Sequence, residues 1–121
     1  YIQGNSSPAG NNPPMTFAAW VRPASTSANT AYALAIGSSS ETSRIIVGRN
    51  GASWRAEIFN SGGLARTIQV AGVSAGTWAH LVYKFINTGS TELFLNGGSI
   101  GTAAGRTLTN QDRVMIGAQI N

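Results

Sequence analysis

Residues 76–101 read GTWAHLVYKFINTGSTELFLNGGSIG, and they decide the fold. Two runs within them, 77–86 and 91–96, place apolar residues at every second position, which is the period of strands that bury one face. The apolar face of the first run holds Ala79, Leu81, Tyr83 and Phe85. The second run ends in Asn96-Gly97, and Asn-Gly supplies the positive φ angles of a type I′ hairpin turn. The stretch therefore predicts two antiparallel strands and a hairpin to a third.

The same signals recur along the whole chain. Short strand-like runs are separated by segments rich in Gly, Pro, Asn and Ser, and no segment has a convincing helical pattern. The predicted strands are 1–4, 15–22, 31–37, 44–49, 53–59, 65–71, 77–86, 91–96, 99–103 and 113–118. Asn50-Gly51 predicts a second type I′ hairpin. Many short strands of this kind predict an all-β fold, an antiparallel two-sheet β-sandwich.

Composition bounds the classes of function. A chain of 121 residues is one domain, 1–121. Its net charge is +4, but the seven arginines are scattered rather than gathered in a stripe, so we expect no nucleic-acid partner. No apolar run approaches the ~20 residues of a membrane helix, so we expect no membrane insertion. The chain has no cysteine, which excludes disulfides and thiolate metal sites.

Four segments together resemble a known family. They are MTFAAWVRPAS at 15–25, AGTWAHLVYKF at 75–85, TELFLNGGSIGTA at 91–103 and VMIGAQ at 114–119. Their order and spacing are similar to those of laminin G-like and pentraxin-like domains of the concanavalin A-like lectin/glucanase superfamily. The resemblance covers residues 1–118. It implies a concanavalin A-like jelly roll that acts as a lectin-like, non-catalytic module, binding carbohydrate or protein as part of a larger extracellular or virion-surface protein.

The chain departs from that family at its ends. Members usually carry one strand before the segment YIQG and a closing strand after VMIGAQ, and this chain shows neither. We expect it to be a fragment of a larger chain, or to complete its sheets by self-association through open edges. The alternative function is therefore structural: a phage decoration, fibre or surface-layer domain that assembles with copies of itself.

Alternation also places large aromatic residues on outer strand faces. Trp20 shares a face with Arg22, and Trp78 shares one with His80. If 15–22 and 77–86 are neighbouring strands, as in the resembled fold, these side chains form one surface on which a sugar ring can stack. The favoured alternative is a small second core, roofed by a loop such as 23–31 or 104–112. Secondary ligand-binding candidates are Trp54 and Phe94, although Trp54 equally fits the main core.

Catalysis has little support in the residues. His80 is the sole histidine, and the chain lacks a Gly-x-Ser-x-Gly elbow. A glycoside hydrolase, the least favoured hypothesis, needs two carboxylates about 5–9 Å apart. The acidic residues are isolated along the sequence: Glu41, Glu57, Glu92 and Asp112. Glu57 could meet Glu92 in space, but a solvent-exposed position is the simpler expectation. We therefore predict no enzymatic activity.

A metal site is equally weakly indicated. Calcium prefers six to eight oxygen ligands, and only Asp112, beside Asn110 and loop carbonyls, offers a carboxylate in a suitable segment. The alternative is a turn in which these side chains cap their own backbone. We predict no cofactor, with calcium at Asp112 as a weak candidate.

Overall fold

A computed structural model describes residues 2–4, 14–27, 30–38, 43–60, 63–109 and 111–117. The strands within these residues are β1 (Ile2–Gly4), β2 (Met15–Val21), β3 (Thr30–Gly37), β4 (Arg44–Asn50), β5 (Ser53–Asn60), β6 (Gly63–Ala71), β7 (Ala79–Asn87), β8 (Ser90–Leu95), β9 (Gly98–Ala103) and β10 (Arg113–Ile116). The described part of the chain contains no helix, and hence none long and apolar enough to cross a membrane.

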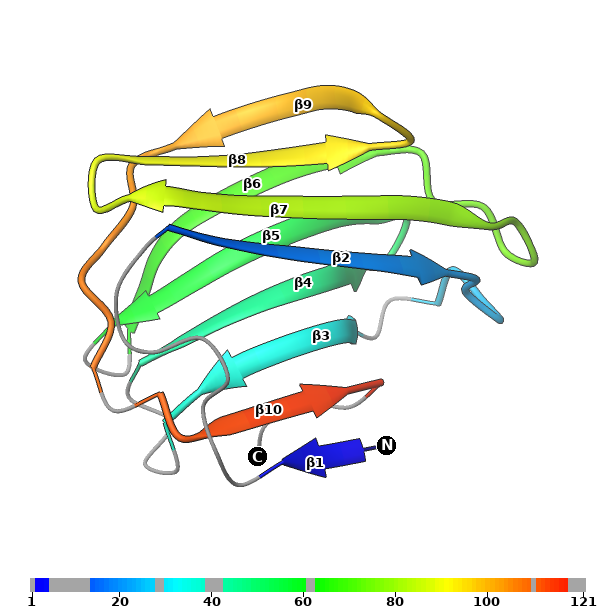
Figure 1. The fold of residues 1–121 in the computed structure, drawn as a ribbon. Helices are drawn as coiled ribbons and strands as arrows, with labels where there is room; N and C mark the ends of the chain where they lie inside the picture. The colour runs from blue at the N-terminus through cyan, green and yellow to red at the C-terminus, as the bar shows by residue number, and fades with distance from the viewer. Residues whose placement is uncertain are drawn as a thin grey trace.

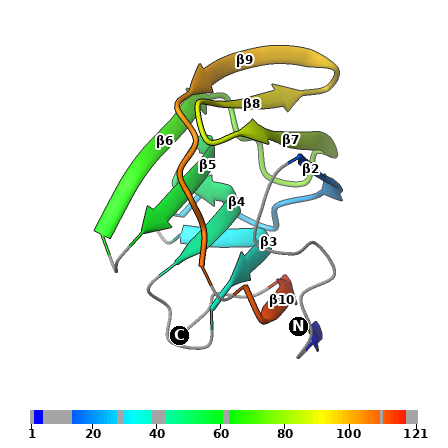
Figure 2. The ribbon, with the colours of Figure 1, turned by 60° about the vertical axis from the view of Figure 1, so that its left-hand side comes forward.

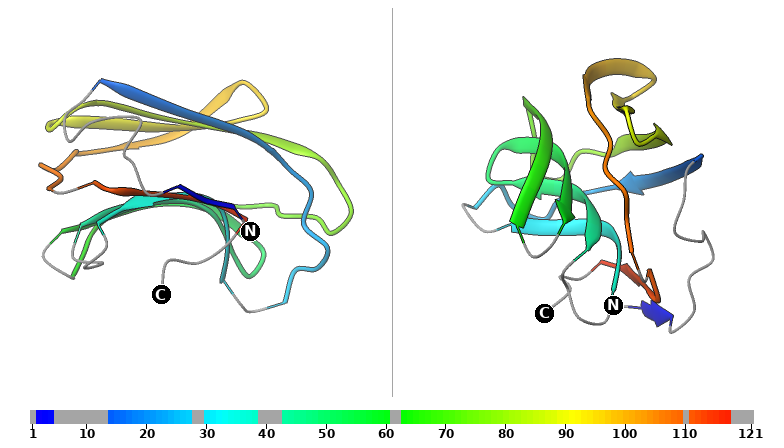
Figure 3. Two further views of the ribbon diagram at one scale, coloured as in Figure 1. Left: turned by 60° about the horizontal axis from the view of Figure 1, so that its bottom comes forward. Right: turned by 90° about the vertical axis from the view of Figure 1, so that its left-hand side faces the viewer.

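The strands form two antiparallel sheets that pack face to face (Figures 1 and 3). The six-stranded sheet has the order β1-β10-β3-β4-β5-β6, and the four-stranded sheet has the order β2-β7-β8-β9. The predicted all-β, two-sheet antiparallel sandwich is confirmed. The largest differences at a strand start are two residues: β6 begins at Gly63 rather than at residue 65, and β7 begins at Ala79 rather than at residue 77.

The core lies between the sheets and is built from the inner faces that alternation predicts. Both sheets contribute, through β2, β7 and β8 on one side and β3, β4, β5 and β6 on the other. At its centre Phe17 stacks on Tyr83, with ring centroids 6.3 Å apart. Phe85 and Leu93 are fully buried. Burying one such side chain stabilises the fold by about 1.5–3 kcal/mol, so the inner faces fix the register.

The two Asn-Gly hairpins turn differently. Asn96 and Gly97 both have positive φ, 49° and 87°, and they form a two-residue loop, so the type I′ prediction is confirmed there. At the other hairpin Asn50 still pairs with Ser53. Its loop is therefore Gly51 and the residue after it, and only Gly51 has positive φ, 56°. This is the pattern of a type II′ turn, so the type I′ prediction was wrong there, because Asn50 belongs to the strand.

A bulge in β3 changes which face one side chain takes. Tyr32 pairs with Gly48, whereas Leu34 pairs with Val47, so Ala33 is an extra residue. Leu34 packs against the core, and the bulge turns Tyr32 to the outer face of the six-stranded sheet. The absent side chain of Gly48 permits the close approach, because a Cβ there would lie 2.3 Å from a β3 carbonyl oxygen.

The sheets differ in width, which leaves a step at one side of the sandwich. β2 is the edge of the four-stranded sheet and contacts β3, while β10 and β1 continue beyond it (Figure 1). Ile116 of β10 pairs with Leu34, so it shares the inner face of the sheet. It is nevertheless 49% exposed. Val114, on the same face of β10, packs against the core, so the inner face is open to solvent only toward the end of β10 at Ile116.

Candidate functional site

Trp20 and His80 form a stacked pair on the outer face of the four-stranded sheet. They are direct partners in the β2–β7 register, and their ring centroids lie 4.8 Å apart with 25° between the planes. The backbone N–H of His80 donates to Asn96 Oδ1 at 2.8 Å, and the N–H of Asn96 donates to the His80 carbonyl at 2.8 Å. The hairpin turn thus fixes His80, which in turn supports one side of the Trp20 ring.

Trp78 reaches the same rim from the loop before β7. The loop is tied to the end of β2 by two hydrogen bonds: Arg22 Nε donates to the Gly76 carbonyl at 2.9 Å, and the Gly76 N–H donates to the Pro23 carbonyl at 2.7 Å. We call Trp20, Arg22, Trp78 and His80 the aromatic platform. Trp20, Arg22 and His80 lie on, or directly after, the neighbouring strands β2 and β7. Trp78 lies in the loop before β7, and the two hydrogen bonds of that loop hold it beside the other three.

The aromatic platform is open to solvent. Trp20 is 67% exposed and Trp78 is 59% exposed. The expectation that a loop roofs this face is therefore wrong, and the positions of the two loops explain why. Segment 104–109 crosses between the sheets at the other end of the sandwich, with Leu108 in the core (Figure 2). Segment 23–27 lies toward the end of β4, because Arg49 Nη1 donates to the Ser27 carbonyl at 3.0 Å.

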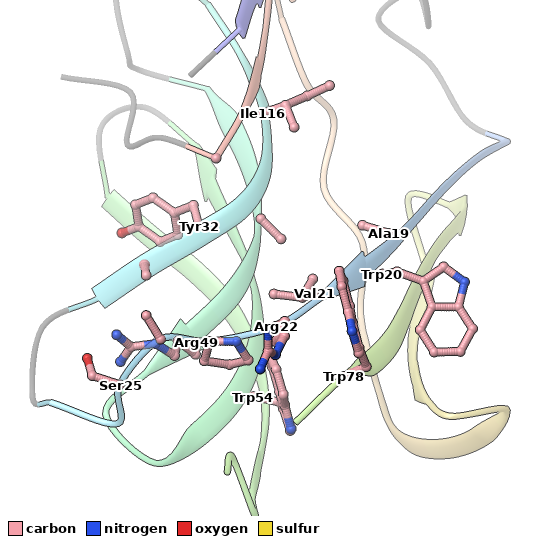
Figure 4. A pocket seen from close by; sticks show the side chains of 15 residues that line it. Ala19, Trp20, Val21, Arg22, Ser25, Tyr32, Arg49, Trp54, Trp78 and Ile116 are labelled. Carbon is pink, nitrogen blue, oxygen red and sulfur yellow. The ribbon is translucent and has the colours of Figure 1, made fainter. Parts of the chain in front are cut away.

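A cleft of about 510 Å³ lies beside the platform, between β2 and the β3–β10 side of the other sheet (Figure 4). Figure 4 shows Val21 pointing into the cleft, and three residues of the aromatic platform, Trp20, Arg22 and Trp78, are also part of its lining. Trp54 lines the cleft but is only 2% exposed and belongs to the core, so the core alternative holds for this residue. Arg49 also lines the cleft and is 8% exposed.

Phe94 lies on the outer face of β8, away from the cleft. The Nζ atom of Lys84 is 4.6 Å from its ring centroid, and the ring is half-buried. Lys84 in turn is the direct partner of Glu92, whose Oε1 accepts a hydrogen bond from Ser99 Oγ at 2.5 Å. Phe94 is therefore held in a polar surface cluster and offers less open ring area than Trp20.

A polar cluster on the outer face of the six-stranded sheet was not predicted as a unit. Glu57 is 2% exposed and forms an ion pair with Arg55. The guanidinium carbon of Arg44 lies 4.1 Å from the Phe59 ring centroid. Burial and then the charge of Glu57 raise the pKa of Tyr32, while the two arginines act in the opposite direction. The alternation of β5 could have predicted that Arg55, Glu57 and Phe59 share one face. It could not have predicted that Tyr32 lies on the same face of the sheet, because that depends on the bulge in β3.

The position of Glu57 corrects two expectations. It was expected at the surface, but its neighbours bury it. The sequence also left open that Glu57 lies close to Glu92 in space. The two carboxylates instead lie on the outer faces of opposite sheets, with the core between them. Packed sheets are about 10 Å apart before outward side chains are added, so this pair does not flank one glycosidic bond.

The calcium candidate lies where the chain enters β10. Asp112 is half-buried, and its backbone N–H donates to the Gly37 carbonyl at 3.1 Å. Asn110 lies outside the described residues. Within the described part of the chain, no three histidine, cysteine or acidic side chains are grouped to hold a metal ion.

Comparisons with solved structures place this sandwich among laminin domains and galectins. The mouse laminin alpha1 chain, domains LG4-5, matches with a TM-score of 0.71 and 7% identity over 95% of this chain. The present chain spans 31% of that laminin chain. A galectin from Caenorhabditis elegans matches with a TM-score of 0.56 and 14% identity, over 96% of this chain and 88% of the galectin. Sheep galectin-11 matches with a TM-score of 0.52 and 10% identity, over 85% and 83%.

Sequence comparison defines the family. No curated protein matches the chain significantly. The family model described as the concanavalin A-like lectin/glucanases superfamily, of laminin G type, matches residues 1–121. The predicted resemblance is confirmed, and with the sandwich described above it shows that the chain belongs to the laminin G-like branch of the concanavalin A-like lectin/glucanases superfamily.

Proposed function

We propose that the protein is a non-catalytic recognition module that binds carbohydrate on the aromatic platform, as part of a larger extracellular protein. The observation that carries the proposal is the exposure of two neighbouring tryptophans, Trp20 at 67% and Trp78 at 59%. A large apolar side chain that remains in solvent beside a second one forms a surface patch of the kind that marks interaction sites. The laminin and galectin likenesses support the module type and the extracellular setting.

The chemistry of the platform suits a sugar better than a purely apolar ligand. An indole face stacks on the C–H face of a pyranose, and polar groups at its edge bond the hydroxyls. His80 backs the Trp20 ring, so that ring is held in one orientation. The bond from Arg22 Nε to Gly76 fixes the guanidinium, whose Nη groups can donate to hydroxyls at the rim. Sheep galectin-11, which shares the fold, was solved with glycerol, itself a polyol.

A glycan array followed by calorimetric titration tests the proposal. The parent chain should bind at least one glycan, and Trp20→Ala and Trp78→Ala should each weaken that binding about tenfold, since one lost stacking contact is worth roughly 1–1.5 kcal/mol. Leu64→Ala is the matched control, because Leu64 is 55% exposed on β6, at the far edge of the other sheet. Its binding should equal that of the parent.

Two results would contradict the proposal. One is an array on which the folded parent binds no glycan. The other is a glycan that binds all three variants with the parent's affinity, which would place its site elsewhere.

A further inference from the structure

A small pocket of about 80 Å³ adjoins the aromatic platform at Trp78. Trp78 and Trp54 line both this pocket and the larger cleft, so the two adjoin at these rings. The rest of the pocket comes from the loop before β7 and from the end of β8 with the turn that follows it. A pocket that encloses a whole drug-sized ligand has roughly 300 Å³ or more. This one therefore has room for a substituent of a sugar, and not for the sugar ring.

The floor of the small pocket is apolar. Trp54 and Ala79 line it and are only 2% and 5% exposed, so they form its depth rather than its rim. Leu95, the last residue of β8, also lines it and packs against the core. Such a floor is removed from water most favourably when an apolar group, such as a methyl, covers it.

The rim of the small pocket is polar and uncharged. Ser74, Thr77 and Asn96 line it and are exposed. Neither the Ser74 nor the Thr77 hydroxyl takes part in a hydrogen bond within the described part of the chain. None of the described residues that line the pocket is charged, which disfavours a carboxylate, a sulfate or an amine as its occupant. The rim therefore suits a neutral group that both accepts and donates hydrogen bonds.

Asn96 presents hydrogen-bond donors in a fixed orientation. Its Oδ1 accepts the His80 N–H at 2.8 Å, and a backbone N–H only donates, so the remaining side-chain atom is the Nδ2 donor. The backbone of Asn96 is held as well, because its N–H donates to the His80 carbonyl at 2.8 Å. Asn96 thus offers amide N–H groups at the rim, next to the residue that stacks on Trp20.

The loop side of the small pocket is held in place before any ligand binds. The N–H groups of Gly72 and Val73 both donate to the Ala52 carbonyl at 3.0 Å. The Thr77 N–H donates to the Ser74 carbonyl at 3.4 Å. A site that is already ordered loses little conformational freedom on binding, so its contacts count in full toward affinity.

We propose that the small pocket receives the acetamido group of an N-acetylated amino sugar whose ring lies against Trp78. This inference rests on the carbohydrate proposal and names its ligand class. An acetamido group carries a methyl, a carbonyl acceptor and an N–H donor. The methyl covers the apolar floor, the carbonyl accepts from Asn96 Nδ2, and the N–H donates to the Thr77 hydroxyl. A hydroxyl at the same ring carbon offers no methyl, and a protonated amine brings an unpaired charge.

The test compares sugars that differ only in this group. A glycan array carries matched sets with acetamido, hydroxyl or free amine at ring carbon 2, in both the gluco and the galacto series. By calorimetry, the acetamido member of at least one series should bind about tenfold more tightly than its partners, through one buried methyl and the added hydrogen bonds. In that complex the acetyl methyl should show nuclear Overhauser effects to the Leu95 methyl groups, since Leu95 lines the small pocket but not the cleft.

Two variants and a matched control locate the effect. Ser74→Phe places a ring at the exposed rim and should abolish the difference between the acetamido and hydroxyl sugars. Thr77→Val keeps the side-chain shape but removes one hydrogen-bond partner, so the difference should fall about threefold. Thr102→Phe adds the same ring at an exposed position of β9 that lines neither the pocket nor the cleft, and it should keep the parent's preference.

The outcomes separate this inference from the carbohydrate proposal. An array on which the folded parent binds no glycan overturns both. Glycans that bind through Trp20 and Trp78 without a preference for the acetamido member overturn this inference alone. It is also overturned by an acetyl methyl that shows no Overhauser effect to Leu95, or by a preference that survives Ser74→Phe in a chain that melts at the parent temperature.

Discussion

Gly48→Ala should destabilise the sandwich, because β3 and β4 approach each other too closely there for a side chain. A Cβ at this position would lie 2.3 Å from the Ala31 carbonyl oxygen and 2.8 Å from the Cα of Tyr32. Ordinary contacts of this kind begin near 3.4 Å, so backbone atoms of the β3 bulge must move by about 1 Å. Backbone shifts forced by overpacking cost about 1–3 kcal/mol. For a domain of this size the loss corresponds to a melting temperature about 4–12 °C lower.

Differential scanning calorimetry measures this effect, and Gly63→Ala is the matched control. Gly63 lies in the same sheet, but a Cβ there would meet only the Asn60 carbonyl oxygen, at 3.8 Å. This control should melt at or slightly above the parent temperature, since alanine restricts the unfolded chain more than glycine does. If Gly48→Ala melted within about 1 °C of the control, the close strand approach and the bulge inferred from it would be wrong.

Two further predictions concern stability. Burial raises the pKa of Tyr83 to about 12 from its usual value of 10.0. The stability from this neutral phenol is therefore complete below pH 10 and is lost by roughly 1.4 kcal/mol per pH unit toward pH 12. Urea unfolding across that window should show a shallower loss for Tyr83→Phe. Asn96→Ala should cost about 1–3 kcal/mol, through its φ of 49° and the lost acceptor for the His80 N–H. Asn96→Gly, which tolerates that φ, should recover part of the melting temperature; equal melting of both variants would exclude backbone strain.

The sequence alone determined the strands, the sandwich and the inner faces. Period-two alternation reports which side chains share a face whatever the sheet order, and burial of one face then fixes the register. Tyr83 and Phe85 were placed on the buried face in this way, and Trp20 on an outer face. The Asn96-Gly97 turn was equally readable, because its φ angles depend only on local chemistry.

Other features depend on contacts between segments that are distant in sequence, and only the tertiary structure showed them. The step beside β2 follows from the unequal widths of the two sheets, which no single strand reveals. Tyr32 changed face because one bulge residue shifts the alternation, and the bulge needs Gly48 on a neighbouring strand. Glu57 is buried because the residues around it come from three strands. The solvent exposure of Trp20 depends on where loops that are distant in sequence pack. A local sequence pattern does not encode contacts of that kind.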